Sequence, residues 1–177
     1  TAIGLDPSTK ATGVVLLGGA EAGTAPMCIL EEVVKAPSGA NGIARAKAIT
    51  TQIMEMLLMH KPDRIVIEGY SLNMKNASSV IPLVELGGMI RFMMHLDGYS
   101  WLAPRATELK KFVTGKGNSP KDAVMMHVFK RWGHEAKSND TSDAYGLACM
   151  GLLHVGALNG GTLAQKEIIG SLPLICN

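Results

Sequence analysis

Short apolar runs, separated by glycine, proline and small polar residues, occupy the first 34 positions of the chain. The runs cover residues 2–6, 13–17 and 27–34, lengths that are typical of strands. Pro7 lacks a backbone donor and so favours the end of the first run, and Gly13 lets the returning chain pass close by. The pattern predicts three strands in a meander.

Beyond the meander the apolar positions change to helical spacing. Ile49, Ile53 and Leu57 lie on one face of an expected amphipathic helix over residues 41–60. Short strands are expected at 64–68 and 100–103, and further helices at 76–96, 106–113, 120–132 and 139–158. We expect one domain over residues 1–158 and a C-terminal tail over 159–177, with a short helix near 164–169.

The expected helix over residues 76–96 contains residues that are unusual in a helix. Pro82 fits only if it falls in the first turn, where no backbone donor is needed. Gly87 and Gly88 are poor helix formers, because glycine in a helix interior costs about 1 kcal/mol. We expect the pair to permit close approach by another helix, within the chain or across a dimer.

Composition narrows the class of protein. The chain is 47% hydrophobic and 18% charged, and its apolar runs stay well short of the roughly 20 residues that a membrane helix needs. The first residues follow a strand pattern, so no secretory signal is expected. Three cysteines, Cys28, Cys149 and Cys176, lie far apart among apolar neighbours, which favours a reducing, intracellular setting over a disulfide framework or a CxxC metal site.

Charge is distributed unevenly along the chain. The net charge is only +2, but residues 104–137 contain eight Lys or Arg against three acids. Such a segregated basic stretch is a candidate surface for a polyanion, although a solvated helix face has a similar composition.

Four acids stand where chemistry is expected. Asp6 and Glu68 each end an expected strand, and Asp140 and Asp143 lie three residues apart on an expected helix. Taken singly, each can be a turn former or an acid that complements the helix dipole. Converging at one sheet edge, they would repel each other unless cations lay between them. Mg²⁺ or Mn²⁺ prefers such oxygen ligands, and two ions about 4 Å apart suit phosphodiester hydrolysis on a basic surface.

The order of these motifs resembles the RuvC-type Holliday junction resolvases of the RNase H-like nuclease superfamily. The resemblance rests on GLDPSTKATG, IVIEG, KNASSVIPLVELGGMI, PRATELKKFVTGKGNSPKDAV and NDTSDAYGLA, and it spans residues 1 to about 158. It implies an α/β fold with an RNase H-like mixed five-stranded sheet flanked by helices. It also implies a homodimer that binds a four-way DNA junction and makes paired nicks with two Mg²⁺ per active site, for which Mn²⁺ substitutes.

The resemblance also assigns roles to residues. Asp6, Glu68, Asp140 and Asp143 are the implied catalytic metal ligands, and Lys121 the implied catalytic lysine near the scissile phosphate. Either Tyr70 or Leu72 would stack at the junction centre. The implied DNA contacts are Tyr70, Leu72, Lys75, Asn76, Arg105, Lys110, Lys116 and Lys121.

The sequence departs from the family pattern after the first two acids. Pro7-Ser8 replaces a Pro-Gly pair, and the loop up to Lys75 and Asn76 is one residue longer. These departures suit a phage-encoded or divergent member that also cuts forks or flaps, acting in the bacterial cytoplasm or that of a host. A non-catalytic DNA-binding module and a fragment of an actin-like ATPase are the remaining alternatives. The single-lobe length argues against the ATPase.

Overall fold

The sheet has five strands in the order β3-β2-β1-β4-β5. In the computed structural model, which describes residues 1–21, 23–70 and 77–176 (only the backbone at 77–79 and 121), β1 pairs antiparallel with β2 and parallel with β4. The expected mixed five-stranded α/β sheet is confirmed. The strands are β1 (Ala2–Asp6), β2 (Thr12–Leu17), β3 (Cys28–Val34), β4 (Arg64–Ile67) and β5 (Trp101–Leu102).

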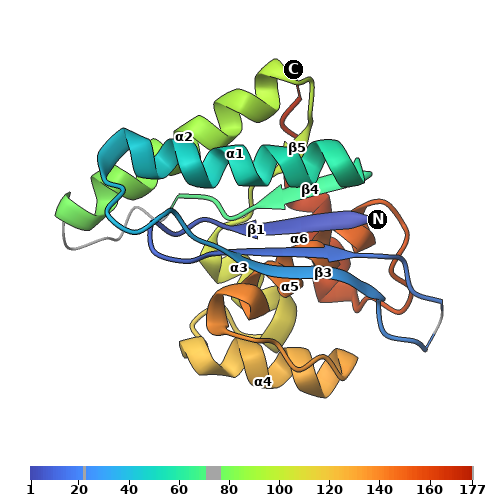
Figure 1. Ribbon diagram of the computed structural model, residues 1–177. Coiled ribbons are helices and arrows are strands. Elements are labelled where there is room, and N and C mark those ends of the chain that lie inside the picture. Colours follow the sequence, from blue (N-terminus) through green and yellow to red (C-terminus); the bar gives the residue numbers. More distant parts are fainter. Residues whose placement is uncertain (22, 71–76, 177) are drawn as a thin grey trace.

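Helices cover both faces of this sheet (Figure 1). Successive residues of β1 point to opposite faces of the sheet. Ile3 and Leu5 pack in the core under α1 and α2, while Ala2 packs with α5. The helices are α1 (Gly42–His60) and α2 (Ala77–Leu96) on one side, and α3 (Ala106–Thr114), α4 (Lys121–Trp132), α5 (Asn139–His154) and α6 (Leu163–Ser171) on the other.

Helix α5 lies directly on β1 and β2 because two glycines leave room for it. A Cβ added to Gly4 would clash with the carbonyl oxygen of Ala144, and one added to Gly13 would clash with that of Asp140. The helix is buried along most of its length, including Tyr145 and Cys149. The backbone of α5 is therefore positioned by backbone contact with the sheet, with no side chain between them.

Two expectations about the helices were wrong, and a third is tested only within the chain. Pro82 lies beyond the first turn of α2, inside the helix. Within the chain, Gly87 admits the ring of Tyr70 and no second helix, since an added Cβ would lie 2.9 Å from Tyr70 Cε1; close approach across a dimer, where Gly88 is exposed, stays a prediction. Helix α5 ends at His154, four residues earlier than expected, and Leu158 instead forms an isolated bridge with Ala20.

The segment after residue 158 packs on the rest of the chain. Ile168 and Ile169 of α6 join the core around α5, and Gln165 Nε2 donates to the Phe112 carbonyl oxygen at 2.9 Å. Ile175 bridges Trp101 at the β5 edge. The division at residue 158 stays a prediction. None of the helices in the described ranges is both long and apolar enough to cross a membrane.

We expect Gly4→Ala to lower the free energy of unfolding by about 3 kcal/mol or more, because the new methyl group forces α5 away from β1. Urea unfolding measures this. Gly170→Ala, at a position where an added Cβ meets nothing within 4 Å, is the control and should stay within about 1 kcal/mol of the native chain. Equal effects of the two substitutions would contradict the close approach.

Candidate active site

Asp6 and Glu68 lie side by side at the carboxyl ends of two neighbouring strands. Asp6 is the last residue of β1, and Glu68 directly follows β4. The two strands are parallel with Leu5 opposite Ile67, and the Glu68 backbone N–H donates to the Leu5 carbonyl oxygen at 3.0 Å. The carboxyl ends of the two strands therefore bring both acids to one edge, as the sequence predicted.

The start of α5 lies at the same edge. Ser138 caps the helix by accepting a hydrogen bond from the Thr141 backbone N–H at 3.2 Å. The Asp140 backbone rests against Gly13, and Gly13 is the strand partner of Asp6. Asp143 follows one helical turn later, and all four acids are half-buried. The structure thus brings together at one edge the backbones of the four acids that the sequence singled out.

This set of side chains fits a divalent cation. Half-buried carboxylates repel one another, and the positive end of the α5 dipole offsets only about half a unit charge. Asp6, Glu68, Asp140 and Asp143 offer oxygen ligands alone, which hard cations such as Mg²⁺ or Mn²⁺ prefer.

The start of α4 lies beside the start of α5. Asn139 Nδ2 donates to Asp122 Oδ1 at 3.5 Å, and Lys121 is the first residue of α4. Lys116 is exposed in the preceding loop, which is held by a 2.7 Å hydrogen bond between the Thr114 and Ser119 hydroxyls. The basic loop thus borders the acidic edge through the backbone at Lys121.

Arg105 and Lys110 precede this loop in the basic segment over residues 104–137. The Arg105 guanidinium, whose side chain is 72% exposed, pairs with Glu108 at 2.6 Å and closes a capping box at the start of α3. Burial alone would raise the pKa of Glu108, but the hydrogen bonds and charge of Arg105 outweigh it and hold the pKa below its ordinary value. Lys110 is half-buried on α3.

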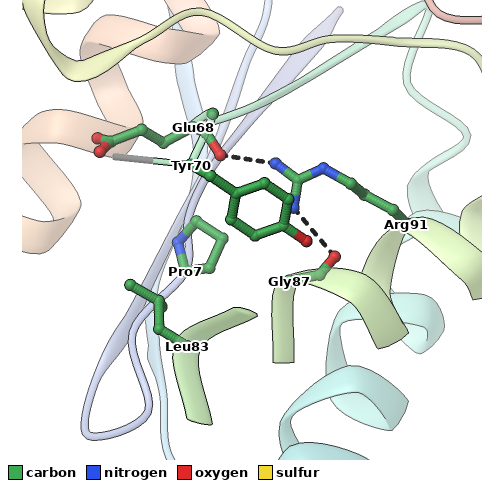
Figure 2. Close-up of a pocket in the computed structure, with 7 residues that line it drawn as sticks. Pro7, Glu68, Tyr70, Leu83, Gly87 and Arg91 are labelled. Atoms are coloured by element: carbon green, nitrogen blue, oxygen red, sulfur yellow. Dashed lines mark hydrogen bonds between the residues drawn. The ribbon is translucent and has the colours of Figure 1, made fainter. Parts of the chain in front are cut away.

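Tyr70 is held against α2 by Arg91, a residue that no sequence motif indicated (Figure 2). The Arg91 guanidinium carbon lies 4.4 Å from the Tyr70 ring centroid, and its nitrogens donate to the carbonyl oxygens of Glu68 at 2.8 Å and Gly87 at 3.0 Å. Burial lowers the pKa of Arg91, while Tyr70 acts in the opposite direction. Only the fold brings these residues together, so the sequence carried no signal for the contact.

A pocket of about 300 Å³ lies between this arginine and the acidic edge. Figure 2 shows the Glu68 carboxylate pointing away from Arg91, whereas the Glu68 carbonyl oxygen points toward it. Arg91 therefore fixes the backbone of a candidate ligand and leaves its carboxylate directed elsewhere. Leu72, Lys75 and Asn76, which the sequence predicted to contact DNA, lie outside the described residues.

An acidic sheet edge next to a basic loop on this mixed five-stranded sheet defines a metal-dependent nuclease of the RNase H-like class. The family model "Crossover junction endodeoxyribonuclease RuvC" matches residues 2–151. The chain belongs to the RuvC family of crossover junction endodeoxyribonucleases, so the expected family is confirmed and the ATPase alternative is set aside.

Relatives agree with this assignment. The RuvC of Carboxydothermus hydrogenoformans is 30% identical over 159 residues, which is 88% of this chain and 98% of the relative. The RuvC of Chlorobium phaeovibrioides is 30% identical over 178 residues, covering 98% and 91%.

Solved structures share the fold. Thermus thermophilus RuvC in complex with a Holliday junction substrate superposes with a TM-score of 0.77 at 18% identity, covering 98% of both chains. The yeast mitochondrial Holliday junction resolvase Ydc2 has a TM-score of 0.58 at 11% identity, covering 96% of this chain and 80% of its own.

We expect Arg91→Ala to lower the free energy of unfolding by about 3 kcal/mol, because it removes two charge-assisted hydrogen bonds and a cation–π contact. Chemical denaturation monitored by circular dichroism measures the loss. Arg131→Ala is the control, because that exposed guanidinium lies 5.9 Å from the Trp132 ring and should contribute less than about 1 kcal/mol. Similar losses in both variants would show that Arg91 does not anchor this site.

Proposed function

We propose that the chain resolves four-way DNA junctions by hydrolysing phosphodiester bonds with two divalent metal ions, Mg²⁺ or Mn²⁺. The observation that carries the proposal is the convergence of Asp6, Glu68 and the Asp140 end of α5 on one sheet edge. Membership of a crossover junction endodeoxyribonuclease family supports the substrate class. We propose the cytoplasm as its place of action, bacterial or that of a phage host.

In this proposal the four acids bind the metal ions and Lys121 interacts with the scissile phosphate. Asp6, Glu68, Asp140 and Asp143 hold the ions, which when bound activate a water molecule and stabilise the leaving oxygen. Lys121, at the start of α4, lies near the scissile phosphate and balances its charge. The site is half-buried, so the charges act in a medium where they interact more strongly than in bulk water.

Other basic residues position the DNA. Lys110, Lys116 and Arg105 come from α3 and its flanking loops and would contact the phosphate backbone, which supplies affinity without sequence information. Tyr70 is 41% exposed at the edge of the acidic site, where an aromatic residue would stack on a base. Leu72, Lys75 and Asn76 follow it in sequence and would extend this contact at the junction centre.

An exposed apolar stripe on α2 supports a homodimer. Ile81, Val84, Phe92 and Leu96 are each between 44% and 60% exposed, and their spacing puts them on one face, together with the exposed Glu85 and Gly88. Contiguous exposed apolar residues mark interaction surfaces in soluble proteins. Pairing two chains through α2 would present two active sites to one junction, as paired nicks require.

We expect Glu68→Gln to lower the rate of junction cleavage more than about 100-fold, because even an outer-shell partner of a metal ligand costs 10- to 100-fold. The measurement is cleavage of labelled synthetic four-way junctions, forks, flaps and linear duplex with Mg²⁺. Glu55→Gln, at an exposed position of α1, is the control and should cleave like the native chain. Symmetric nicks confined to the junction support strict resolution, and equal fork or flap cutting supports the broader branched-DNA activity. Binding without cutting by the native chain would leave the non-catalytic module.

We expect Phe92→Glu to convert the dimer to a monomer, because it places a charge in the centre of the apolar stripe. Sedimentation velocity measures the change. Phe129→Glu, on α4 and 56% exposed, is the control and should leave the assembly intact. A native chain that sediments as a monomer at micromolar concentration would refute the α2 interface.

A further inference from the structure

A second group of ligand-type side chains lies away from the four acids. Cys28, Glu31 and His134 place a sulfur, a carboxylate oxygen and an imidazole nitrogen within 4.8 Å of one another. Among the described residues, this is the one group of three His, Cys, Asp or Glu side chains whose ligand atoms lie that close together. No sequence motif indicates this group, because His134 is more than 100 positions from the two strand residues.

A β-bulge makes this grouping possible. In a regular strand, residues three apart point to opposite faces. The pairing of β2 with β3 shifts register between Leu16 and Leu17, so that Leu16 pairs with Leu30 but Leu17 pairs with Cys28. The extra residue, Ile29, turns Cys28 to the sheet face that Glu31 shares with α5.

The carboxylate and the imidazole are held with their ligand atoms together. The Lys137 backbone N–H donates to Glu31 Oε1 at 2.7 Å, which leaves Oε2 directed at His134 Nε2, 3.2 Å away. The imidazole stacks on Tyr145 with ring centroids 4.3 Å apart. Nε2 is buried, and among the described residues it has no hydrogen bond of acceptable geometry. Outer-shell contacts of this kind orient the ligands in metal sites.

We propose that Cys28, Glu31 and His134 bind one Zn²⁺ ion. Thiolate, carboxylate and neutral imidazole are all zinc ligands, whereas the sulfur and nitrogen disfavour Mg²⁺. With metal–ligand bonds of about 2.0–2.3 Å, a tetrahedral ion separates its ligand atoms by about 3.3–3.7 Å, which suits the 3.2 Å between Oε2 and Nε2. A water molecule completes the fourth position. The thiolate and the carboxylate together neutralise the charge of the ion.

The ion would link the edge strand β3 to the segment between α4 and α5. His134 lies just after the end of α4 and four residues before Ser138, which caps α5. The linked segment therefore leads directly into the helix that carries Asp140 and Asp143. The role is structural, and it does not depend on the proposed DNA cleavage.

The test is titration of chelator-stripped protein with Zn²⁺ alone, in excess Mg²⁺ to fill the carboxylate site, against a chromophoric chelator. We expect one tight zinc site per chain, weakened about 100-fold by Cys28→Ser and unchanged in Cys176→Ser, a second exposed cysteine. Glu31→Gln should weaken binding about tenfold or more, and Glu32→Gln, its exposed neighbour on β3, should not.

A Co²⁺ titration identifies the ligand directly, because a thiolate bound to cobalt gives a near-ultraviolet charge-transfer band. The band should be lost in Cys28→Ser and kept in Cys176→Ser, with unchanged circular dichroism. Absence of a tight zinc site, or equal binding by the Cys28→Ser and Cys176→Ser chains, would overturn the proposal.

Discussion

The contact on which the rest of the structure depends is the packing of α5 onto β1 and β2. Gly4 and Gly13 let the helix backbone touch the sheet backbone, and any side chain there would separate them. The same contact fixes the position of the Asp140 backbone next to Gly13, which pairs with Asp6 across β1 and β2. The core and the candidate active site are therefore built on one interface, and what destabilises it also displaces the acids.

Much of this could be read from the sequence because local rules govern it. The positions of Asp6 and Glu68 at or next to strand ends follow from apolar runs, and the start of α5 near Asn139 follows from helical spacing. The contact at Gly87 could not be read from the sequence, since the ring beside it belongs to Tyr70, which lies in the loop after β4. A contact between residues 17 or more positions apart leaves no periodic signal.

The two candidate metal sites differ in their ligands and in how the fold forms them. The acids Asp6 and Glu68 meet because parallel strands end at one edge, a topological consequence that needs no local irregularity. Cys28 and Glu31 share a face only because a bulge shifts the register of β3. Oxygen ligands suit a hard cation at the first site, and the mixed set of sulfur, oxygen and nitrogen ligands suits zinc at the second. The same fold can therefore present a catalytic metal site and a structural one.

Anomalous diffraction from crystals of the native chain with Mn²⁺ and an uncleavable junction tests directly whether the four acids bind the metal ions. We expect two peaks among the side chains of Asp6, Glu68, Asp140 and Asp143, both absent from Glu68→Gln crystals or much weaker there. Peaks elsewhere on the chain, in a preparation that cuts junctions in solution, would contradict the assignment of the active site to this sheet edge.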